Sequence, residues 1–330
     1  MGNLYFLILY PTIILIFILI SHKLKLVDKP NSRKIHTKPV INTSGIAIYF
    51  FLLIIISLNE FSYELETVIA IGLFITLIGF IDDRINLTPG VKLFFKSLPI
   101  IYLILNGFNL NDLGDYEFIE IIYLGKFNFV FTFFAAMLLI NAFNYIDGID
   151  GLLIGITITA CLYFIILSNK SADYVILLSY FIYALIFNLI LNVLPKNLFF
   201  KCFSGNTGSL FFGFFIGFSM IYLYKYENIH PALLIWSCWY PVFDFLYVTF
   251  DRLIKKKQFA LADETHFHHQ LTKYFNNNQY KSSIFINSLN ITVVAVGYLI
   301  GTTLGKIFSL VFFIILFYLF VILRKNLFKK

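Results

Sequence analysis

Residues 141–153 read NAFNYIDGIDGLL, and they lie between two long apolar runs near 128–144 and 150–168. Each run approaches the roughly 20 apolar residues that a helix needs to cross a lipid bilayer. Asp147 and Asp150 therefore sit close to a predicted membrane surface, where ionisable groups are costly and are usually retained for function. The stretch predicts a short polar loop between two membrane-spanning helices.

The composition extends this pattern to the whole chain. Of its 330 residues, 59% are hydrophobic and 13% are charged, against about 45–50% and about 25% in soluble domains. The sequence therefore predicts an all-α, polytopic integral membrane protein, one domain with about 10–11 transmembrane helices. The apolar segments lie near 3–22, 44–58, 66–81, 91–107, 128–144, 150–168, 172–193, 208–224, 229–250, 284–301 and 305–323. The last two are joined by GTTLG, and a single re-entrant unit is the alternative for this pair.

The basic residues give an orientation. One set of connections comprises the loops near 22–43, 82–90, 145–149, 194–207 and 251–283 and the C-terminal tail. With Lys92 and Lys96 counted in, this set holds all of the 25 Lys and Arg except Lys126, Lys170, Lys225 and Lys306. Basic residues collect on the cytoplasmic side, so the N-terminus is predicted outside and the C-terminus in the cytoplasm. The net charge of +7 then reflects topology and contact with the lipid bilayer, and no nucleic acid partner is expected.

Two adjacent acids begin the second inner loop. Asp82 and Asp83 open the stretch DDRINLTPGVK, which ends at Lys92. Adjacent carboxylates repel each other unless a cation or a proton is shared, and both oppose the dipole at a helix C-terminus. The pair therefore favours a divalent cation, although a solvated helix end with a turn at Pro89 and Gly90 would also explain it.

The opening stretch has a similar chemistry. Asn144, Asp147 and Asp150 are spaced by three, so they would share one face if the segment were helical. Gly148 and Gly151 would let a backbone or a ligand approach closely. Oxygen ligands of this kind suit Mg²⁺, which usually binds one or two carboxylates plus substrate phosphates. A polar turn with glycine breakers is the alternative.

Two further loops are candidates for anion binding. Gly205 and Ser209 lie in FSGNTGSLFFG at the start of the eighth apolar segment, where a helix N-terminus would offer N–H groups to a phosphate. An ordinary N-cap at Ser209 is the alternative. His266, His268 and His269 lie in THFHHQL without partners at a zinc spacing. Hydrogen bonds to a nucleotide or diphosphate fit them better, and chance histidines on a surface loop are the alternative.

The first inner loop is basic and includes Lys34 and His36. Topology explains most of this charge, and a phosphate-bearing lipid headgroup would also dock there. Together, the inner loops offer paired acids, amides, a helix N-terminus, histidines and cations on one face. This set predicts phosphoryl transfer assisted by a divalent metal. One substrate is expected to be a lipid phosphate, because the site lies at the membrane surface.

Five motifs, in order along nearly the whole chain, resemble those of the polyprenyl-phosphate N-acetylhexosamine-1-phosphate transferases. They are DKPNSRKIHTKPV, DDRINLTPGVK, NAFNYIDGIDGL, Asn192 followed by SGNTGS, and HFHH. That family includes the translocase that makes the first lipid-linked peptidoglycan precursor. It also includes enzymes that start the O-antigen of lipopolysaccharide, enterobacterial common antigen and teichoic acid chains. The resemblance implies an enzyme of the bacterial cytoplasmic membrane with its active site on the cytoplasmic face.

The resemblance also implies the reaction. A UDP-N-acetylhexosamine would give its sugar 1-phosphate to undecaprenyl phosphate and release UMP, with Mg²⁺ as cofactor or Mn²⁺ as its substitute. A homodimer is the candidate assembly. Catalytic roles are implied for Asp82, Asp83, Asp147 and Asp150, and metal binding for Asp82, Asp83, Asp147 and Asn206. Substrate contacts are implied for Lys34, His36, Lys92, Asn144, Asn192, Gly205, Ser209, His266, His268 and His269.

Two positions depart from the family pattern. Asn206 stands where the family has a metal-binding aspartate, and its amide oxygen can coordinate Mg²⁺ but brings no charge. Glu264 stands where the family often has an arginine. These departures leave a second hypothesis, a catalytically impaired relative that binds lipid phosphate or nucleotide. An intramembrane prenyltransferase would need two DxxxD motifs, which the sequence lacks. A transporter would show mid-span acids or internal repeats, whereas Asp244, near an inner end, is the one clear acid within a span.

Overall fold

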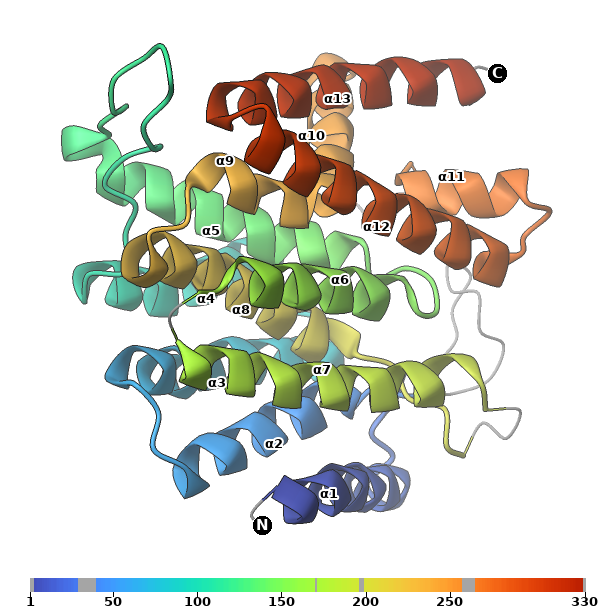
Figure 1. Ribbon diagram of the computed structural model, residues 1–330. Helices are drawn as coiled ribbons and strands as arrows, with labels where there is room; N and C mark the ends of the chain where they lie inside the picture. Colours follow the sequence, from blue (N-terminus) through green and yellow to red (C-terminus); the bar gives the residue numbers. More distant parts are fainter. Residues whose placement is uncertain (1–2, 29–39, 170, 196–198, 257–264, 329–330) are drawn as a thin grey trace.

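The computed structural model describes residues 3–28, 40–169, 171–195, 199–256 and 265–328. The predicted class is confirmed, since this part of the chain forms a bundle of α-helices (Figure 1). The α-helices are α1 (Asn3–Lys23), α2 (Ser44–Leu58), α3 (Tyr63–Ile85), α4 (Pro89–Leu105), α5 (Asn128–Tyr145), α6 (Leu152–Leu167), α7 (Ala172–Val193), α8 (Gly205–Glu227), α9 (Pro231–Leu234), α10 (Trp239–Ile254), α11 (Phe267–Tyr274), α12 (Gln279–Thr303) and α13 (Lys306–Leu327). Two 3₁₀ turns, η1 (Gly125–Phe127) and η2 (Ile235–Cys238), and two antiparallel strands, β1 (Val27–Asp28) and β2 (Val40–Ile41), complete the elements.

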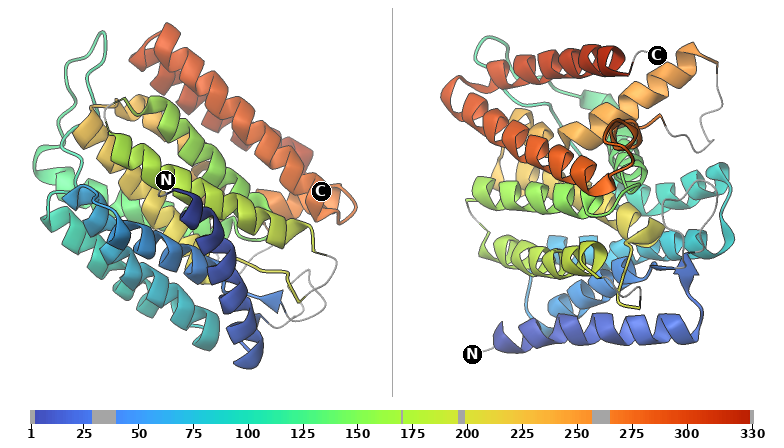
Figure 2. Two further views of the ribbon diagram at one scale, coloured as in Figure 1. Left: turned by 60° about the horizontal axis from the view of Figure 1, so that its bottom comes forward. Right: turned by 90° about the vertical axis from the view of Figure 1, so that its right-hand side faces the viewer.

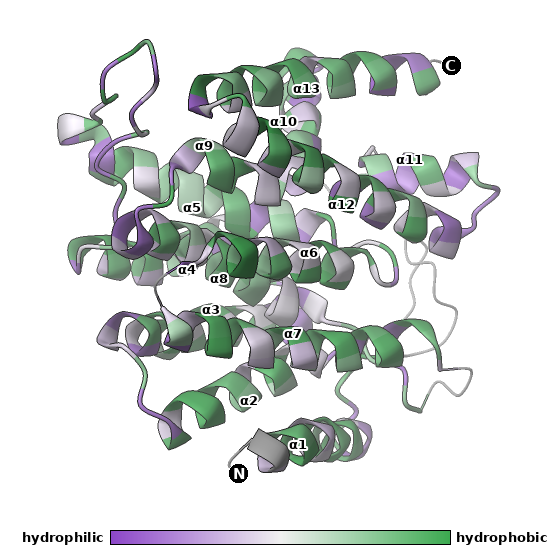
Figure 3. Ribbon diagram, viewed as in Figure 1, coloured by the Kyte–Doolittle hydropathy of each residue, from purple (hydrophilic) through white to green (hydrophobic). Residues whose placement is uncertain are grey.

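Every predicted apolar segment is occupied by helix. Within the described residues, 8 helices or helical runs are long and apolar enough to cross a membrane. They are Tyr5–Lys23, Tyr63–Ile85, Gly125–Tyr145, Ala172–Val193, Gly205–Glu227, Pro231–Ile254, Gln279–Thr303 and Lys306–Leu327. The remaining predicted spans coincide with α2 and α6, which are shorter apolar helices, and with α4, which has 17 residues. Figure 3 shows hydrophobic residues along the helices and hydrophilic ones concentrated at their ends and connections.

The last pair of segments forms two separate helices, which favours two spans over a single re-entrant unit. α12 has 25 residues and α13 has 22, so each is long enough to cross the bilayer alone. The segment near 229–250 is also more complex than predicted. It begins as the short helix α9, passes through η2 and continues as α10.

α8 is the central helix of the bundle. It packs against α2, α3, α5 and α6, and its side chains are mostly buried. Glycines bring the neighbouring backbones close, as is common between membrane helices. A Cβ atom on Gly79 of α3 would lie 2.5 Å from the Cα of Thr207, and one on Gly213 would lie 2.8 Å from the Cα of Ile140 in α5. The position of α8 is therefore fixed by backbone contacts on two sides.

A substitution at Gly213 tests this packing. Gly213→Ala is expected to lower the free energy of unfolding by about 1–3 kcal/mol, because the added methyl group meets backbone that cannot move aside. Thermal unfolding of the purified protein in detergent measures the change. Gly90→Ala is the matched control, since a Cβ there meets nothing within 4 Å and alanine favours the helix. Equal or greater stability in Gly213→Ala would contradict the close contact of α5 and α8.

The two ends of the bundle differ in chemistry. At one end, the connection between α4 and α5 folds onto the start of α13, where the Glu117 carboxylate accepts hydrogen bonds from the N–H groups of Lys306 and Ile307 at 2.6 and 3.0 Å. At the other end lie the last turns of α3, α5 and α7, the first turns of α6, α8 and α12, and helix α11. The right-hand view of Figure 2 looks onto this second end, which carries the candidate site.

Candidate functional site

The structure brings most of the sequence-predicted site residues to one end of the bundle. They lie at the C-terminal ends of α3, α5 and α7, in the loop between α5 and α6, at the start of α8, and at the start of α11. Lys34, His36 and Glu264 lie outside the described residues. The residues that the sequence motifs indicate are therefore distant along the chain but close together in space.

Asp83 lies at the N-terminus of α8. Its Oδ1 accepts a hydrogen bond from the N–H of Asn206 at 3.0 Å, and its Oδ2 accepts from the N–H and the hydroxyl of Thr207 at 3.2 and 2.9 Å. Gly205, which has a φ of +63°, allows this approach, because a Cβ there would lie 2.7 Å from Oδ2 of Asp83. A helix N-terminus attracts anions. Here the anion is the Asp83 carboxylate of the chain itself. It accepts hydrogen bonds from two of the N–H groups that the sequence predicts for binding a phosphate.

Asp82 has different partners from its neighbour. Its Oδ2 forms an ion pair with the Lys92 amine at 2.6 Å, and its Oδ1 accepts a hydrogen bond from the N–H of Leu87 at 2.9 Å. The Asp82 side chain is 2% exposed, whereas that of Lys92 is 33% exposed. The repulsion between the adjacent acids is therefore offset by a cation on one and a helix N-terminus on the other.

Asn144 connects α5 to the same place. Its amide donates hydrogen bonds to Oδ1 of Asn206 at 2.9 Å and to the hydroxyl of Ser209 at 2.8 Å. Because Asn206 also donates its N–H to Asp83, side chains from α3, α5 and α8 meet around it. This meeting point forms the centre of the candidate site.

The expected face of Asn144, Asp147 and Asp150 does not form, because the segment is not one helix. α5 ends at Tyr145 and α6 begins at Leu152. Asp147 is exposed, while Asp150 is buried, pairs with Lys201 at 2.6 Å and accepts a hydrogen bond from Gln279 at 3.1 Å. The three side chains are therefore presented in three different environments.

Asn192 holds the loop between α5 and α6 against the segment before α8. Its Oδ1 accepts from the N–H of Gly151 at 2.6 Å, and its Nδ2 donates to the carbonyl of Cys202 at 3.0 Å. Gly151 has a φ of +76° at the start of α6, a conformation that favours glycine. A substrate contact by Asn192 stays a prediction, and the contacts in this structure are to backbone.

Residues 265–271, here called the histidine segment, pack on the loop between α5 and α6. His268 is fully buried, and within the described residues neither of its ring nitrogens has a hydrogen-bond partner. A Cβ on Gly148 would fall on Nε2 of His268 and lie 3.0 Å from Cε1 of His269. Burial, followed by the neighbouring His269, lowers the pKa of His268 well below its ordinary value, so the ring is neutral at pH 7. A buried neutral imidazole without a partner is suited to hydrogen-bonding a ligand.

Two further lysines lie at this end of the bundle, and the sequence explains both by membrane topology alone. Lys96 is buried in α4 and donates a hydrogen bond to Oδ1 of Asn141 at 2.5 Å. Lys201 pairs with Asp150. The signal for Lys96 was available, because it lies within an apolar segment four residues after Lys92 and charged residues there are usually functional. The partner of Lys201 is 51 residues away, and no local pattern indicates it.

The oxygen donors at the centre of the site fit Mg²⁺. Asp83 and Asn206 supply a carboxylate and an amide oxygen from adjoining helix ends, and Mg²⁺ usually takes one or two carboxylates together with substrate phosphates. In the part of the chain that the structure describes, no group of three or more His, Cys, Asp or Glu could hold a metal ion by itself. Substrate phosphate oxygens would therefore have to complete the coordination.

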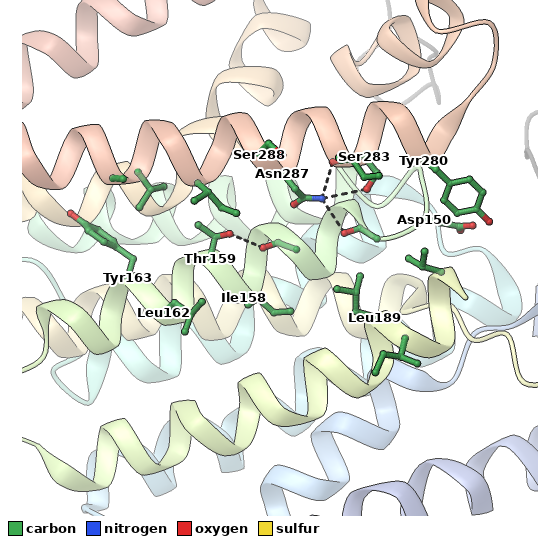
Figure 4. Close-up of a pocket in the computed structure, with 18 of the residues that line it drawn as sticks. Asp150, Ile158, Thr159, Leu162, Tyr163, Leu189, Tyr280, Ser283, Asn287 and Ser288 are labelled. Atoms are coloured by element: carbon green, nitrogen blue, oxygen red, sulfur yellow. Dashed lines mark hydrogen bonds between the residues drawn. The ribbon is translucent and has the colours of Figure 1, made fainter. Parts of the chain in front are cut away.

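An apolar groove opens beside Asp150 (Figure 4). It has a volume of about 920 Å³ and is lined by residues of α6, α7 and α12. Asp150, Tyr280 and Ser283 lie at one end of it, and Tyr163 lies at the other (Figure 4). Such a lining suits a hydrocarbon chain better than a nucleotide.

A bundle of membrane-spanning helices with acids, amides and histidines gathered at one end is the architecture of a multi-pass membrane protein with a polar site at that end. Residues 65–224, which run from α3 to α8, match the model of glycosyl transferase family 4. The matched region includes Asp82, Asp83, Asn144, Asn192 and Asn206. The chain is therefore similar to glycosyl transferase family 4 over just under half of its length.

Individual relatives extend the match. The chain is 27% identical over 264 residues to the probable undecaprenyl-phosphate N-acetylglucosaminyl 1-phosphate transferase of Bacillus subtilis, covering 77% of this chain and 72% of the relative. It is 29% identical over 267 residues to the undecaprenyl-phosphate alpha-N-acetylglucosaminyl 1-phosphate transferase of Yersinia pestis, covering 77% and 71%. The protein of that name from Escherichia coli O157:H7 is 27% identical over 280 residues, covering 80% and 74%.

Proposed function

We propose that this protein transfers an N-acetylhexosamine 1-phosphate from a UDP-sugar to undecaprenyl phosphate, which starts a lipid-linked glycan of the bacterial envelope. The observation that carries the proposal is the meeting of Asp83, Asn144 and Asn206 at one end of the bundle, with the histidine segment packed on the adjacent loop. A lipid phosphate and a soluble nucleotide can meet only at such an end. The similar proteins, which carry undecaprenyl phosphate in their names, support the lipid substrate.

In this reaction, an oxygen of the lipid phosphate attacks the β-phosphorus of the UDP-sugar. The bond from that phosphorus to the bridging oxygen breaks, and UMP leaves with the electron pair. Asp82, paired with Lys92, would orient the lipid phosphate or take its proton, and Asp83 would assist it. Asn144 and the acids Asp147 and Asp150 would hold the nucleotide and diphosphate.

The remaining predicted residues surround these groups. Gly205 and Ser209 at the start of α8, Asn192, and the histidines His266, His268 and His269 would complete the substrate contacts. Mg²⁺, or Mn²⁺ in its place, would be held by Asp83 and Asn206 together with substrate phosphates and would neutralise phosphate charge. Of the other expected metal ligands, Asp82 pairs with Lys92 and Asp147 is exposed, and the described residues contain no group of three acids that could hold the ion. The site end would face the cytoplasm, with the N-terminus outside, because the basic residues lie mainly on the connections of that end.

A second function is favoured by one observation. Asn206 brings no charge, and its Oδ1 accepts a hydrogen bond from Asn144. A catalytically impaired relative that binds lipid phosphate or nucleotide would tolerate such a residue. Turnover by the natural protein that depends on Mg²⁺ would exclude this alternative.

The charge at position 206 provides an experiment on the metal site. Asn206→Asp is expected to lower the Mg²⁺ concentration for half-maximal UMP release by about tenfold, because an added carboxylate strengthens binding of a hard divalent cation. A Mg²⁺ titration of UMP release by both proteins measures the shift. Asn278→Asp is the matched control, since an aspartate there still accepts the hydrogen bond from Lys281 N–H at the start of α12. An unchanged or increased Mg²⁺ requirement in Asn206→Asp would show that residue 206 does not bind the metal.

A further inference from the structure

A buried carboxylate in α10 joins three segments of the chain. Oδ2 of Asp244 lies 2.7 Å from Nδ1 of His266. Its Oδ1 accepts hydrogen bonds from the N–H of Phe267 at 2.8 Å and from Nη1 of Arg324 at 2.6 Å. Asp244 is 0% exposed and Arg324 is 1% exposed. α10, the histidine segment and the last turn of α13 are therefore tied to one carboxyl group.

Arg324 has a full set of partners. Besides Asp244, its guanidinium donates hydrogen bonds to Oε1 of Gln270 at 3.1 Å and to the carbonyl of Thr265. It also lies 4.0 Å from the centre of the Tyr247 ring, an arrangement that favours a cation. Buried charges are tolerated when they are paired and hydrogen-bonded, and both conditions hold here. The ends of the histidine segment are thus held by a residue of the C-terminal helix.

These contacts fix both the direction and the tautomer of the histidine segment. α11 begins at Phe267, so the carboxylate of Asp244 lies at its N-terminus. A carboxylate accepts hydrogen bonds, so Nδ1 of His266 carries a proton, and in the neutral ring Nε2 is then an acceptor. Two residues later, His268 lies against Gly148. A shift of Asp244 would therefore move both histidines relative to the loop between α5 and α6.

We propose that Asp244 and Arg324 are positioning residues that hold His266 and His268 in place for binding the nucleotide end of the UDP-sugar. The identity of the ligand rests on the proposed function. Neither residue touches substrate, and both act through His266 and the start of α11. The C-terminal helix α13 contributes to the site through these hydrogen bonds of Arg324 and through the contact of the Phe320 ring with the Phe267 ring.

Steady-state kinetics of the full-length protein in detergent test this role, with undecaprenyl phosphate and UDP-N-acetylglucosamine as substrates. Asp244→Asn and Arg324→Gln are expected to lower kcat/KM for the UDP-sugar about 100-fold, since a displacement of about 1 Å can cost that much. The KM for the UDP-sugar rises, and the KM for undecaprenyl phosphate stays unchanged. Lys325→Gln removes the same charge from an exposed neighbour, and Asp251→Asn removes a carboxylate from the surface pair with Lys255. Both controls retain the natural constants.

A double variant separates positioning from stability. Each single substitution leaves a buried charge without its partner, which destabilises a protein strongly, whereas removal of both partners is often neutral. Asp244→Asn combined with Arg324→Gln is therefore expected to regain the natural melting temperature while kcat/KM for the UDP-sugar stays low. Recovery of both quantities would show that the pair only stabilises the fold, and would overturn the proposal.

A spectroscopic measurement keeps this inference independent of the proposed function. The chain has six histidines, so ¹⁵N labelling of the imidazoles gives few signals, and His266→Gln assigns the one of interest. Asp244→Asn is expected to shift the Nδ1 signal of His266. An unchanged signal would rule out the positioning role of Asp244, even if the enzyme is active. If the signal shifts but the natural protein neither binds nor turns over any UDP-sugar, the proposed function fails and the contact itself stands.

Discussion

Asp83→Asn is expected to lower the turnover number by about a thousandfold, the scale lost when a group that stabilises transferring phosphoryl charge is removed. The reason is the position of this carboxylate. It touches the N–H groups of Asn206 and Thr207 at the start of α8, and Asn206 in turn contacts Asn144. An amide at position 83 can keep part of these hydrogen bonds but brings no negative charge for Mg²⁺. UMP release under saturating substrates measures the effect.

The control for Asp83→Asn must separate catalysis from the loss of an anion at a helix N-terminus, which by itself costs about 0.3–1 kcal/mol. Asp173 lies in the first turn of α7, at the opposite end of that helix from Asn192. Asp173→Asn removes a carboxylate from a comparable place and is expected to leave turnover unchanged. Near-normal turnover in Asp83→Asn, in protein with a natural melting temperature, would remove Asp83 from the catalytic group.

Gly148→Ala is expected to reduce kcat/KM for the UDP-sugar about 100-fold, because it displaces the histidine segment. The added methyl group would fall on Nε2 of His268, and that ring is fully buried. The backbone of Gly148 does not have a positive φ, so alanine fits the local conformation. The loss is therefore assigned to the collision and not to backbone strain.

A double-mutant cycle checks this cause. His268→Ala removes the ring that the methyl group meets, so Gly148→Ala should cost little in that background, and the two effects should be strongly non-additive. Kinetic constants for the two single variants and the double variant give the coupling. Additive losses would contradict the contact between His268 and Gly148 as the source of the effect.

The apolar pattern of the sequence predicted the helices well, because each membrane-spanning segment is set by a local property. The eleven expected segments coincide with helices, including the last two, which form α12 and α13. Local pattern failed where two elements meet. Asn144, Asp147 and Asp150 suggest a shared helix face, but α5 stops at Tyr145 and α6 begins only at Leu152.

The interaction partners of the site residues cannot be predicted from the sequence for the same physical reason. The carboxylate of Asp83 caps a helix that begins more than a hundred residues later, and Asp244 finds Arg324 at a separation of 80 residues. Such pairs are set by how the helices pack and leave no periodic signal in either segment. The family motifs indicated which residues share a site, and the structure shows which atoms they contact.

Release of UMP by the purified full-length protein tests the central claim most directly. Undecaprenyl phosphate is supplied with a panel of UDP-N-acetylhexosamines, first with Mg²⁺ and then with excess EDTA. The proposed function predicts that one UDP-sugar releases UMP, and that release requires both the lipid phosphate and the metal. A folded protein that releases no UMP with any of these sugars, either as the natural chain or as Asn206→Asp, would contradict a sugar-1-phosphate transferase.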